Sequence, residues 1–154
     1  MVPNPQLLKE LTQRFQLDQS LSKEKNWEKL MNVYPKNTKW LEGIIREVGW
    51  PSQNLVGIFG EQAAWLIVQH SGDVKFQEKC LRLIKNLPLT NERKHYIAYL
   101  TDRILVRGGN KQLYGTQYDG IQPFPIENEK ELDLRRKTMG LGPFSEYHKL
   151  MAKN

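Results

Sequence analysis

The stretch that decides the fold of this 154-residue chain is QAAWLIVQH, residues 62–70, its most apolar run. Residues three and four apart share one face of a helix. Leu66, Ile67 and His70 therefore fall on one face, and Trp65 and Gln69 fall on the neighbouring face. The stretch predicts a core helix that carries a histidine and two amides, those of Gln62 and Gln69, where apolar side chains would be expected. A polar site at this helix is the starting hypothesis.

Composition limits the classes of protein that the chain could be. Hydrophobic residues make up 39% and charged residues 26%, which is typical of a globular protein with one core. No run approaches the roughly 18 apolar residues that span a membrane, and residues 1–5 lack the pattern of a signal peptide. These features predict a cytoplasmic protein. The net charge is +6, but the basic residues are scattered among acidic ones, which argues against nucleic acid as a partner.

Cysteine and histidine usage gives no sign of a metal or a disulfide. Cys80 is the only cysteine, and it shares a helix face with Phe76 and Ile84, so we expect a buried structural thiol. The three histidines are far apart in sequence, and no CxxC or HExxH motif is present. No phosphate loop or nucleotide-binding fingerprint occurs either. The sequence therefore predicts neither a metal nor a cofactor.

Helical periodicity and capping signals extend along most of the chain. Asp18 to Ser20 predicts a break after the first helix, and Tyr34 to Asn37 predicts a turn because proline disfavours a helical residue before it. Ser22, Thr38, Asp73 and Thr90 are the expected N-caps, and Gly49 is an expected stop. The predicted helices cover 5–17, 22–33, 38–48, a segment from 57 or 61 to 71, 74–86, 91–106, 129–139 and 145–151.

A short β segment interrupts the helical pattern near residues 111–126. Lys111 to Tyr118 alternates as a strand does, Asp119-Gly120 is a turn signal, and the prolines at 123 and 125 keep the chain extended. Gly115 within the alternation indicates a bulge or a close backbone approach. We expect a mainly α fold of about six to eight helices with a small β-hairpin. The predicted organisation is a single domain, 1–154, with an N-terminal helical pair at 1–36 and a core at 38–154.

Several motifs together resemble a bacterial family of domains of unknown function. They are GWP at 49–51, LVG at 55–57, AAWLIVQH at 63–70, FQ at 76–77, YLTDR at 99–103, QLYGTQ at 112–117, PIE at 125–127, RR at 135–136, GL at 140–141 and EY at 146–147. The resemblance implies a fold shared with that family. It also suggests that the polar residues of these motifs lie together. Asn128 stands where the family usually has an acidic residue, which argues against a carboxylate role there.

This set of polar side chains suggests acid–base chemistry. Histidine titrates near pH ~6.5, so His70 could serve as a general base, with Asp73 or Asp102 as the carboxylate that orients it. Tyr114 could act as a general acid or as a hydrogen-bond donor, which makes His70, Asp102 and Tyr114 the predicted catalytic residues. The residues predicted to bind substrate are Trp65, Gln69, Arg103, Gln112, Thr116, Gln117, Arg135 and Arg136.

The arginines and glutamines are predicted to bind substrate because of their hydrogen-bonding chemistry. Arginine grips a carboxylate or a phosphate through two parallel hydrogen bonds, and glutamine can hold an amide or a developing oxyanion. The sharpest hypothesis is a cofactor-free enzyme that performs hydrolysis, elimination or cyclisation on a small molecule or peptide.

Non-catalytic hypotheses stand beside this one. A histidine on an apolar helix face is often a core residue whose nitrogens are satisfied by neighbours, and a buried polar network can fix a structure without catalysis. The protein could instead be a module that binds a peptide or a small ligand. It could also be a partner protein such as an immunity factor. An enzyme requires a concave pocket, whereas a partner protein requires a broad exposed patch.

Overall fold

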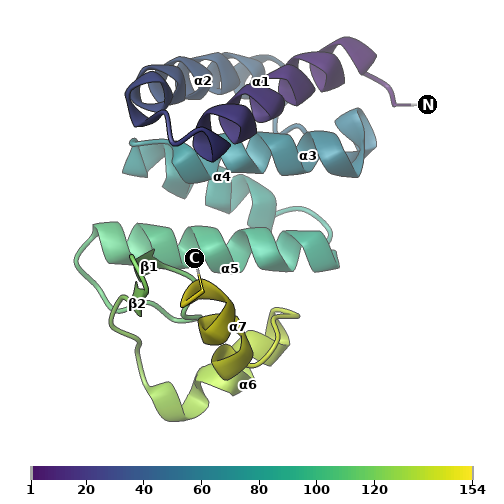
Figure 1. Ribbon diagram of the computed structural model, residues 1–154. Helices are drawn as coiled ribbons and strands as arrows, with labels where there is room; N and C mark the ends of the chain where they lie inside the picture. Colours follow the sequence, from purple (N-terminus) through teal and green to yellow (C-terminus); the bar gives the residue numbers. More distant parts are fainter. Residues whose placement is uncertain (1, 154) are drawn as a thin grey trace. The chain divides into compact units, whose positions relative to one another are not determined.

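Residues 2–153 are described by a computed structural model, and they form seven α-helices, one 3₁₀-helix and one antiparallel β-hairpin (Figure 1). The predicted mainly α fold with a small hairpin is confirmed. Over the described residues, no helix combines the length and the apolar character needed to cross a bilayer. Contacts divide the chain into unit 1, residues 1–80, and unit 2, residues 81–154. The single-domain organisation stays a prediction, and each unit is described by itself.

Unit 1 consists of three long helices and the first part of a fourth. The helices are α1 (Pro5–Lys23), α2 (Trp27–Val48), α3 (Gln53–His70) and α4 (Val74–Lys85), which continues into unit 2. The first three pack against one another pairwise (Figure 1). Leu11, Leu30, Leu41 and Val68 are fully buried. The QAAWLIVQH stretch lies in α3, so the predicted core helix is confirmed.

The predicted turn at residues 34–37 is wrong, because α2 runs straight through it with Pro35 inside the helix. Proline in a helix interior costs about 3 kcal/mol. Here Leu30 and Leu41, on either side of Pro35, are both fully buried, and their packing outweighs that cost. Thr38 is not an N-cap: its hydroxyl donates to the carbonyl oxygen of Tyr34 within the helix.

Two other predicted boundaries in unit 1 also shift. The predicted break at Asp18 to Ser20 is wrong, because α1 continues to Lys23, and Asn26 rather than Ser22 caps α2. The start of α3 lies at Gln53, ahead of both predicted positions. A kink at Gly57, where φ is +75°, explains why the sequence pattern appeared to begin there.

Unit 2 is built around α5 (Asn91–Arg107), which Thr90 caps as predicted. After α5 come β1 (Tyr118–Asp119) and β2 (Gln122–Pro123), the 3₁₀-helix η1 (Glu129–Glu131), α6 (Leu132–Thr138) and α7 (Phe144–Met151). In the hairpin Tyr118 pairs with Pro123 and Asp119 with Gln122. Figure 1 shows the hairpin and α7 on one side of α5.

The strand expected from residue 111 is much shorter than the alternation predicts. Gln112 forms only an isolated bridge with Ile126, and residues 113–117 are irregular. The close approach predicted at Gly115 is confirmed: φ is +67°, and an added Cβ would lie 2.8 Å from Cε2 of Phe144. Side-chain hydrogen bonds, described below, hold this segment in place of a sheet.

Cys80 is buried, as predicted, and burial raises the pKa of its thiol from 9.0 to about 12. We expect iodoacetamide at about pH 8 to leave the native thiol unlabelled, since thiolate is the reactive form, and to label it after unfolding. The raised pKa adds stability that is fully present below the unfolded pKa of 9.0 and is lost as the pH rises toward about 12. Rapid labelling of the native protein, followed by mass spectrometry, would contradict this description.

Candidate functional site

His70, the last residue of α3, makes a short contact with a carboxylate of α1. Its Nδ1 lies 2.6 Å from Oδ2 of Asp18. The His70 side chain keeps 26% of its surface exposed, whereas that of Asp18 keeps 6%. Because an ionised carboxylate only accepts hydrogen bonds, Nδ1 of His70 is the donor. Within residues 2–153 no hydrogen bond engages Nε2, so this nitrogen is left for other partners.

Helix positions explain why the two side chains meet. Asp18 falls on the stripe of α1 that also buries Leu7, Leu11 and Leu21, so the packing of α1 against α3 carries its carboxylate inward. Its other oxygen accepts a hydrogen bond of 3.0 Å from the amide of Gln19. Each carboxylate oxygen therefore has a donor, as a buried charge requires.

The end of α3 is held by a buried amide of α4. Gln77 Nε2 donates to the carbonyl oxygen of Val68 at 3.0 Å and to that of Ser71 at 3.2 Å. These carbonyls belong to the last turn and the exit of α3, where the usual N–H partner four residues further on is missing. The contact fixes the backbone on both sides of His70, and it gives the FQ motif a structural role.

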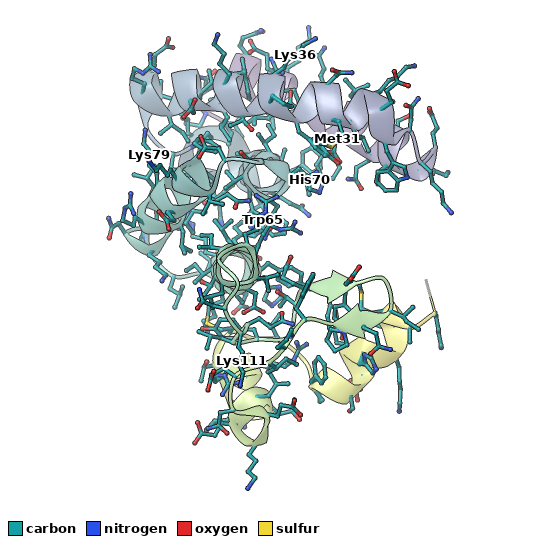
Figure 2. All side chains as sticks on the ribbon, turned by 90° about the vertical axis from the view of Figure 1, so that its left-hand side faces the viewer. Met31, Lys36, Trp65, His70, Lys79 and Lys111 are labelled. Carbon is teal, nitrogen blue, oxygen red and sulfur yellow. The ribbon has the colours of Figure 1, made fainter. Side chains whose placement is uncertain are left out.

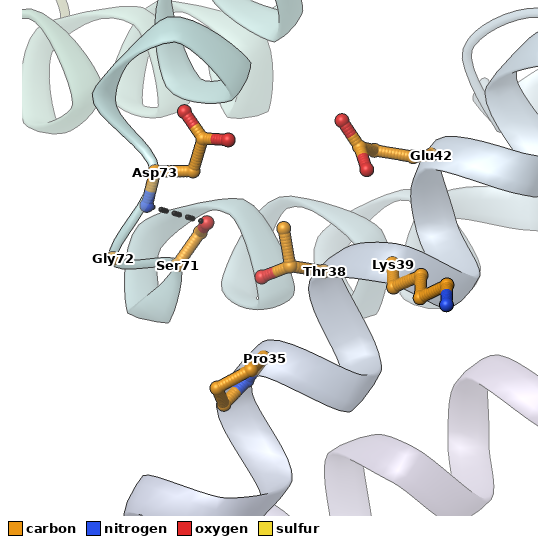
Figure 3. A pocket seen from close by; sticks show the side chains of 7 residues that line it. All are labelled: Pro35, Thr38, Lys39, Glu42, Ser71, Gly72 and Asp73. Carbon is orange, nitrogen blue, oxygen red and sulfur yellow. Dashed lines mark hydrogen bonds between the residues drawn. The ribbon is translucent and has the colours of Figure 1, made fainter.

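A recess opens between α2 and the turn that joins α3 to α4, with a volume of about 500 Å³. Its lining consists of Pro35, Thr38, Lys39, Glu42, Ser71, Gly72 and Asp73. Figure 3 shows the carboxylates of Glu42 and Asp73 facing the same space. This volume is within the range of small-molecule sites.

The His70 side chain also lies close to an aromatic ring of α2. The imidazole ring lies 4.9 Å from the ring of Tyr34, centroid to centroid. Tyr34 and His70 each directly precede a residue that lines the recess, Pro35 and Ser71, and neither ring is part of that lining. Figure 2 marks His70 at the end of α3. A partly exposed imidazole whose Nδ1 is held by a carboxylate is an arrangement suited to proton transfer.

The carboxylates predicted to orient His70 have other hydrogen bonds. Asp73 caps α4, because its Oδ1 accepts from the backbone N–H of Phe76 at 3.0 Å, which confirms its structural prediction. Asp102, in unit 2, accepts from the segment after α5. Asp18 is the partner that sequence reasoning missed, having been interpreted as part of a helix break. Its signal was an acidic residue on the apolar stripe of α1.

Asp102 is fully buried and anchors the segment that follows α5. Its carboxylate accepts from the backbone N–H groups of Leu113 at 2.7 Å, Tyr114 at 3.0 Å and Thr116 at 3.0 Å, and from the Thr116 hydroxyl at 2.9 Å. Burial raises the pKa of Asp102, and these hydrogen bonds oppose the rise. All of its near contacts are donors within the fold, so its evident role is structural.

Gln112 and Gln117 hold the same segment through side-chain hydrogen bonds. Gln112 Nε2 donates to the carbonyl oxygens of Gln117 and Phe124, at 3.0 and 2.8 Å, and its Oε1 accepts from the Gln117 backbone N–H at 2.8 Å. Gln117 Nε2 donates to the Thr116 hydroxyl at 3.0 Å. The side-chain amide of Gln112 therefore satisfies backbone groups that would pair between strands in a sheet.

Arg135 and Arg136 tie α6 to that segment. Nε of Arg135 donates to the carbonyl oxygen of Leu113 at 2.8 Å, and its guanidinium also reaches the carbonyl of Glu127. Arg136, 2% exposed, donates to the carbonyl oxygens of Tyr114 at 2.6 Å and Gly142 at 2.7 Å. Both guanidiniums, which were predicted to bind substrate, therefore donate to backbone carbonyls of the same unit.

The other predicted site residues are divided between the units. Trp65 and Gln69 lie in unit 1 with His70, where Gln69 is buried. Arg103 lies in unit 2 with Asp102 and Tyr114. Burial raises the pKa of Tyr114, with the charge of Asp102 adding to the rise. The meeting of His70, Asp102 and Tyr114 in one site stays a prediction. Among residues 2–153, no three histidine, cysteine or acidic side chains form a metal-binding group.

Comparison with known proteins places the chain by family. No curated protein and no solved structure gives a significant match to it. One family model, described as a family of unknown function (DUF6624), matches residues 20–154. The match begins earlier than the GWP motif, at which the resemblance in the sequence starts. It includes His70 and every residue predicted to bind substrate, whereas Asp18 lies just ahead of it. The chain therefore belongs to the DUF6624 family.

Proposed function

We propose that the protein is an acid–base enzyme that acts on a small molecule or a peptide, with His70 as the residue that accepts and returns the proton. The observation that supports this most strongly is the 2.6 Å contact between His70 Nδ1 and Asp18, made by an imidazole that is 26% exposed. A carboxylate that holds one imidazole nitrogen fixes the tautomer and stabilises the imidazolium that forms during proton transfer. Nε2 is then the reacting nitrogen.

The recess lined by Ser71, Gly72 and Asp73, which directly follow His70 in the chain, is the proposed substrate site. It offers carboxylates from Glu42 and Asp73, an ammonium from Lys39 and the Thr38 side chain. This mixture suits a polar substrate that carries amine or amide groups more than a purely apolar one. Asp73 already caps α4 with Oδ1, so its second oxygen is the one available to a ligand. Hydrolysis, elimination and cyclisation all begin with a proton transfer that His70 could perform.

A panel of chromogenic esters, peptide amides and amino-acid derivatives tests this proposal. Replacing His70 by glutamine should lower turnover of any accepted substrate by about 10²–10⁴-fold, the usual contribution of a general base. His95→Gln is the matched control, because it makes the same change at a histidine of unit 2 that bonds to the Gly140 carbonyl. Turnover that His70→Gln leaves unchanged would show that the chemistry lies elsewhere.

A non-catalytic ligand-binding module is the second candidate. The recess itself favours this candidate, because its lining includes charges of both signs. Such a lining can bind a polar ligand without catalysing a reaction. The same panel separates the two candidates. A compound that raises the melting temperature of wild type, is not turned over, and loses its effect in a Glu42→Gln variant would favour binding alone.

A further inference from the structure

A second cavity lies wholly within unit 2, with a volume of about 410 Å³. Arg103 and Arg107 contribute to it from α5, one helical turn apart. The lining also includes Gln117, which precedes the hairpin, Tyr118 in β1, Phe124 after β2, and Met151 at the end of α7. The cavity therefore joins two cationic groups with aromatic and thioether surfaces.

Hydrogen bonds within unit 2 fix the neutral wall of this cavity. Gln112 Nε2 bonds to the carbonyls of Gln117 and Phe124, and the Phe124 backbone N–H donates to the Gln117 carbonyl at 3.1 Å. The Tyr118 hydroxyl lies 3.2 Å from Nδ1 of His148, and the two rings stack with centroids 5.9 Å apart. A wall fixed in this way loses little conformational freedom when a ligand binds.

The charges at the cavity favour an anion. None of the described residues that line it is acidic. Asp102, a buried carboxylate of unit 2, bonds to Thr116 at the wall, and donors from the same segment occupy its oxygens. Asp119 follows Tyr118 in β1 and is exposed to solvent. Arg107 is exposed overall, but partial desolvation of its guanidinium lowers its pKa. The guanidinium stays protonated at neutral pH, and loss of water strengthens its attraction to an anion.

We propose that this cavity binds a small organic anion, with Arg103 and Arg107 holding a carboxylate or phosphate group and Tyr118 and Phe124 contacting a flat apolar body. Arginine pairs with either head group through parallel hydrogen bonds, so both are included. The volume fits a ligand of the size of an aryl phosphate or larger. The site is independent of the His70–Asp18 pair.

Nuclear magnetic resonance titrations of the full chain with four probes test the proposal. The probes are phenyl phosphate, benzoate, inorganic phosphate and benzyl alcohol, and the readouts are the backbone signals of Gln117, Tyr118 and Phe124. At least one aromatic anion should shift these signals and bind about tenfold or more tightly than benzyl alcohol, since a charged hydrogen bond has about that effect. The comparison of phenyl phosphate with benzoate identifies the preferred head group.

Variants that remove one positive charge test whether an arginine of the cavity holds the anion. Arg107 is exposed, so Arg107→Gln should fold normally, and it should weaken binding by about tenfold or more. Lys111→Gln removes the same charge from an exposed residue of unit 2 outside the cavity and should change affinity less than about twofold. Figure 2 marks Lys111. The proposal would be overturned if benzyl alcohol or inorganic phosphate bound as tightly as the aromatic anions. It would also be overturned if neither aromatic anion shifted the signals, or if Arg107→Gln left the affinity unchanged.

Discussion

Asp102→Asn is expected to lower the free energy of unfolding by about 2–4 kcal/mol, because an amide cannot replace a carboxylate that is surrounded by donors. Oδ1 accepts from the backbone N–H groups of Leu113 and Tyr114, and Oδ2 accepts from both the N–H and the hydroxyl of Thr116. Asparagine can accept at one oxygen only, so its NH₂ group would face donors in a fully buried place. Chemical denaturation followed by circular dichroism measures the loss.

A matched control sharpens this prediction. Asp119→Asn makes the same change at an exposed residue and should alter stability by less than about 0.5 kcal/mol. A loss in Asp102→Asn no larger than that of Asp119→Asn would contradict the anchoring role of the Asp102 carboxylate.

Asp18→Asn is expected to lower turnover by about 10²–10⁴-fold once a substrate of His70 is found, since removal of the orienting carboxylate from such a pair has effects of this size. Asparagine can still accept a hydrogen bond from Nδ1 of His70, but it cannot stabilise the imidazolium. The substrate affinity should change much less than the turnover number.

Two comparisons test whether Asp18 acts through His70. Gln19→Ala removes only the donor to the other oxygen of Asp18 and should have a much smaller effect on turnover. The double variant of Asp18→Asn and His70→Gln should be scarcely slower than His70→Gln alone, because the two residues act as a unit. Losses that simply multiply in the double variant would mean that the residues act separately.

The helices of unit 1 were predictable wherever an apolar stripe and a capping residue agree, as they do from Leu41 to Gly49. They were not predictable at Pro35, where the local rule against proline was opposed by burial of Leu30 and Leu41. That burial depends on partners distant in the sequence, so no local pattern reports it. In unit 2 the alternation after Lys111 indicated a strand, whereas buried side chains hold the segment instead.

Part of the candidate site could also be predicted from the sequence. A histidine on the apolar face of residues 62–70 led to His70 directly. Its partner could have been found by the same test, because Asp18 occupies the buried stripe of α1 as His70 occupies that of α3. The packing of the helices determines which carboxylate pairs with which imidazole, and no local sequence pattern predicts that packing. Arg136 and Gln112 were placed among ligand-binding residues, but their polar atoms bond to backbone groups of the same unit.

Long-range ¹H–¹⁵N spectra of the imidazole rings test the pairing of His70 with Asp18 most directly, with His95 and His148 as internal references. The 2.6 Å contact predicts that Nδ1 of His70 carries a hydrogen at neutral pH, and that its signal lies at low field and moves on Asp18→Asn while those of His95 and His148 stay in place. If Nδ1 carries no hydrogen, Nε2 carries it instead, and both signals are unchanged in Asp18→Asn, then the His70–Asp18 pair and the function proposed from it are contradicted.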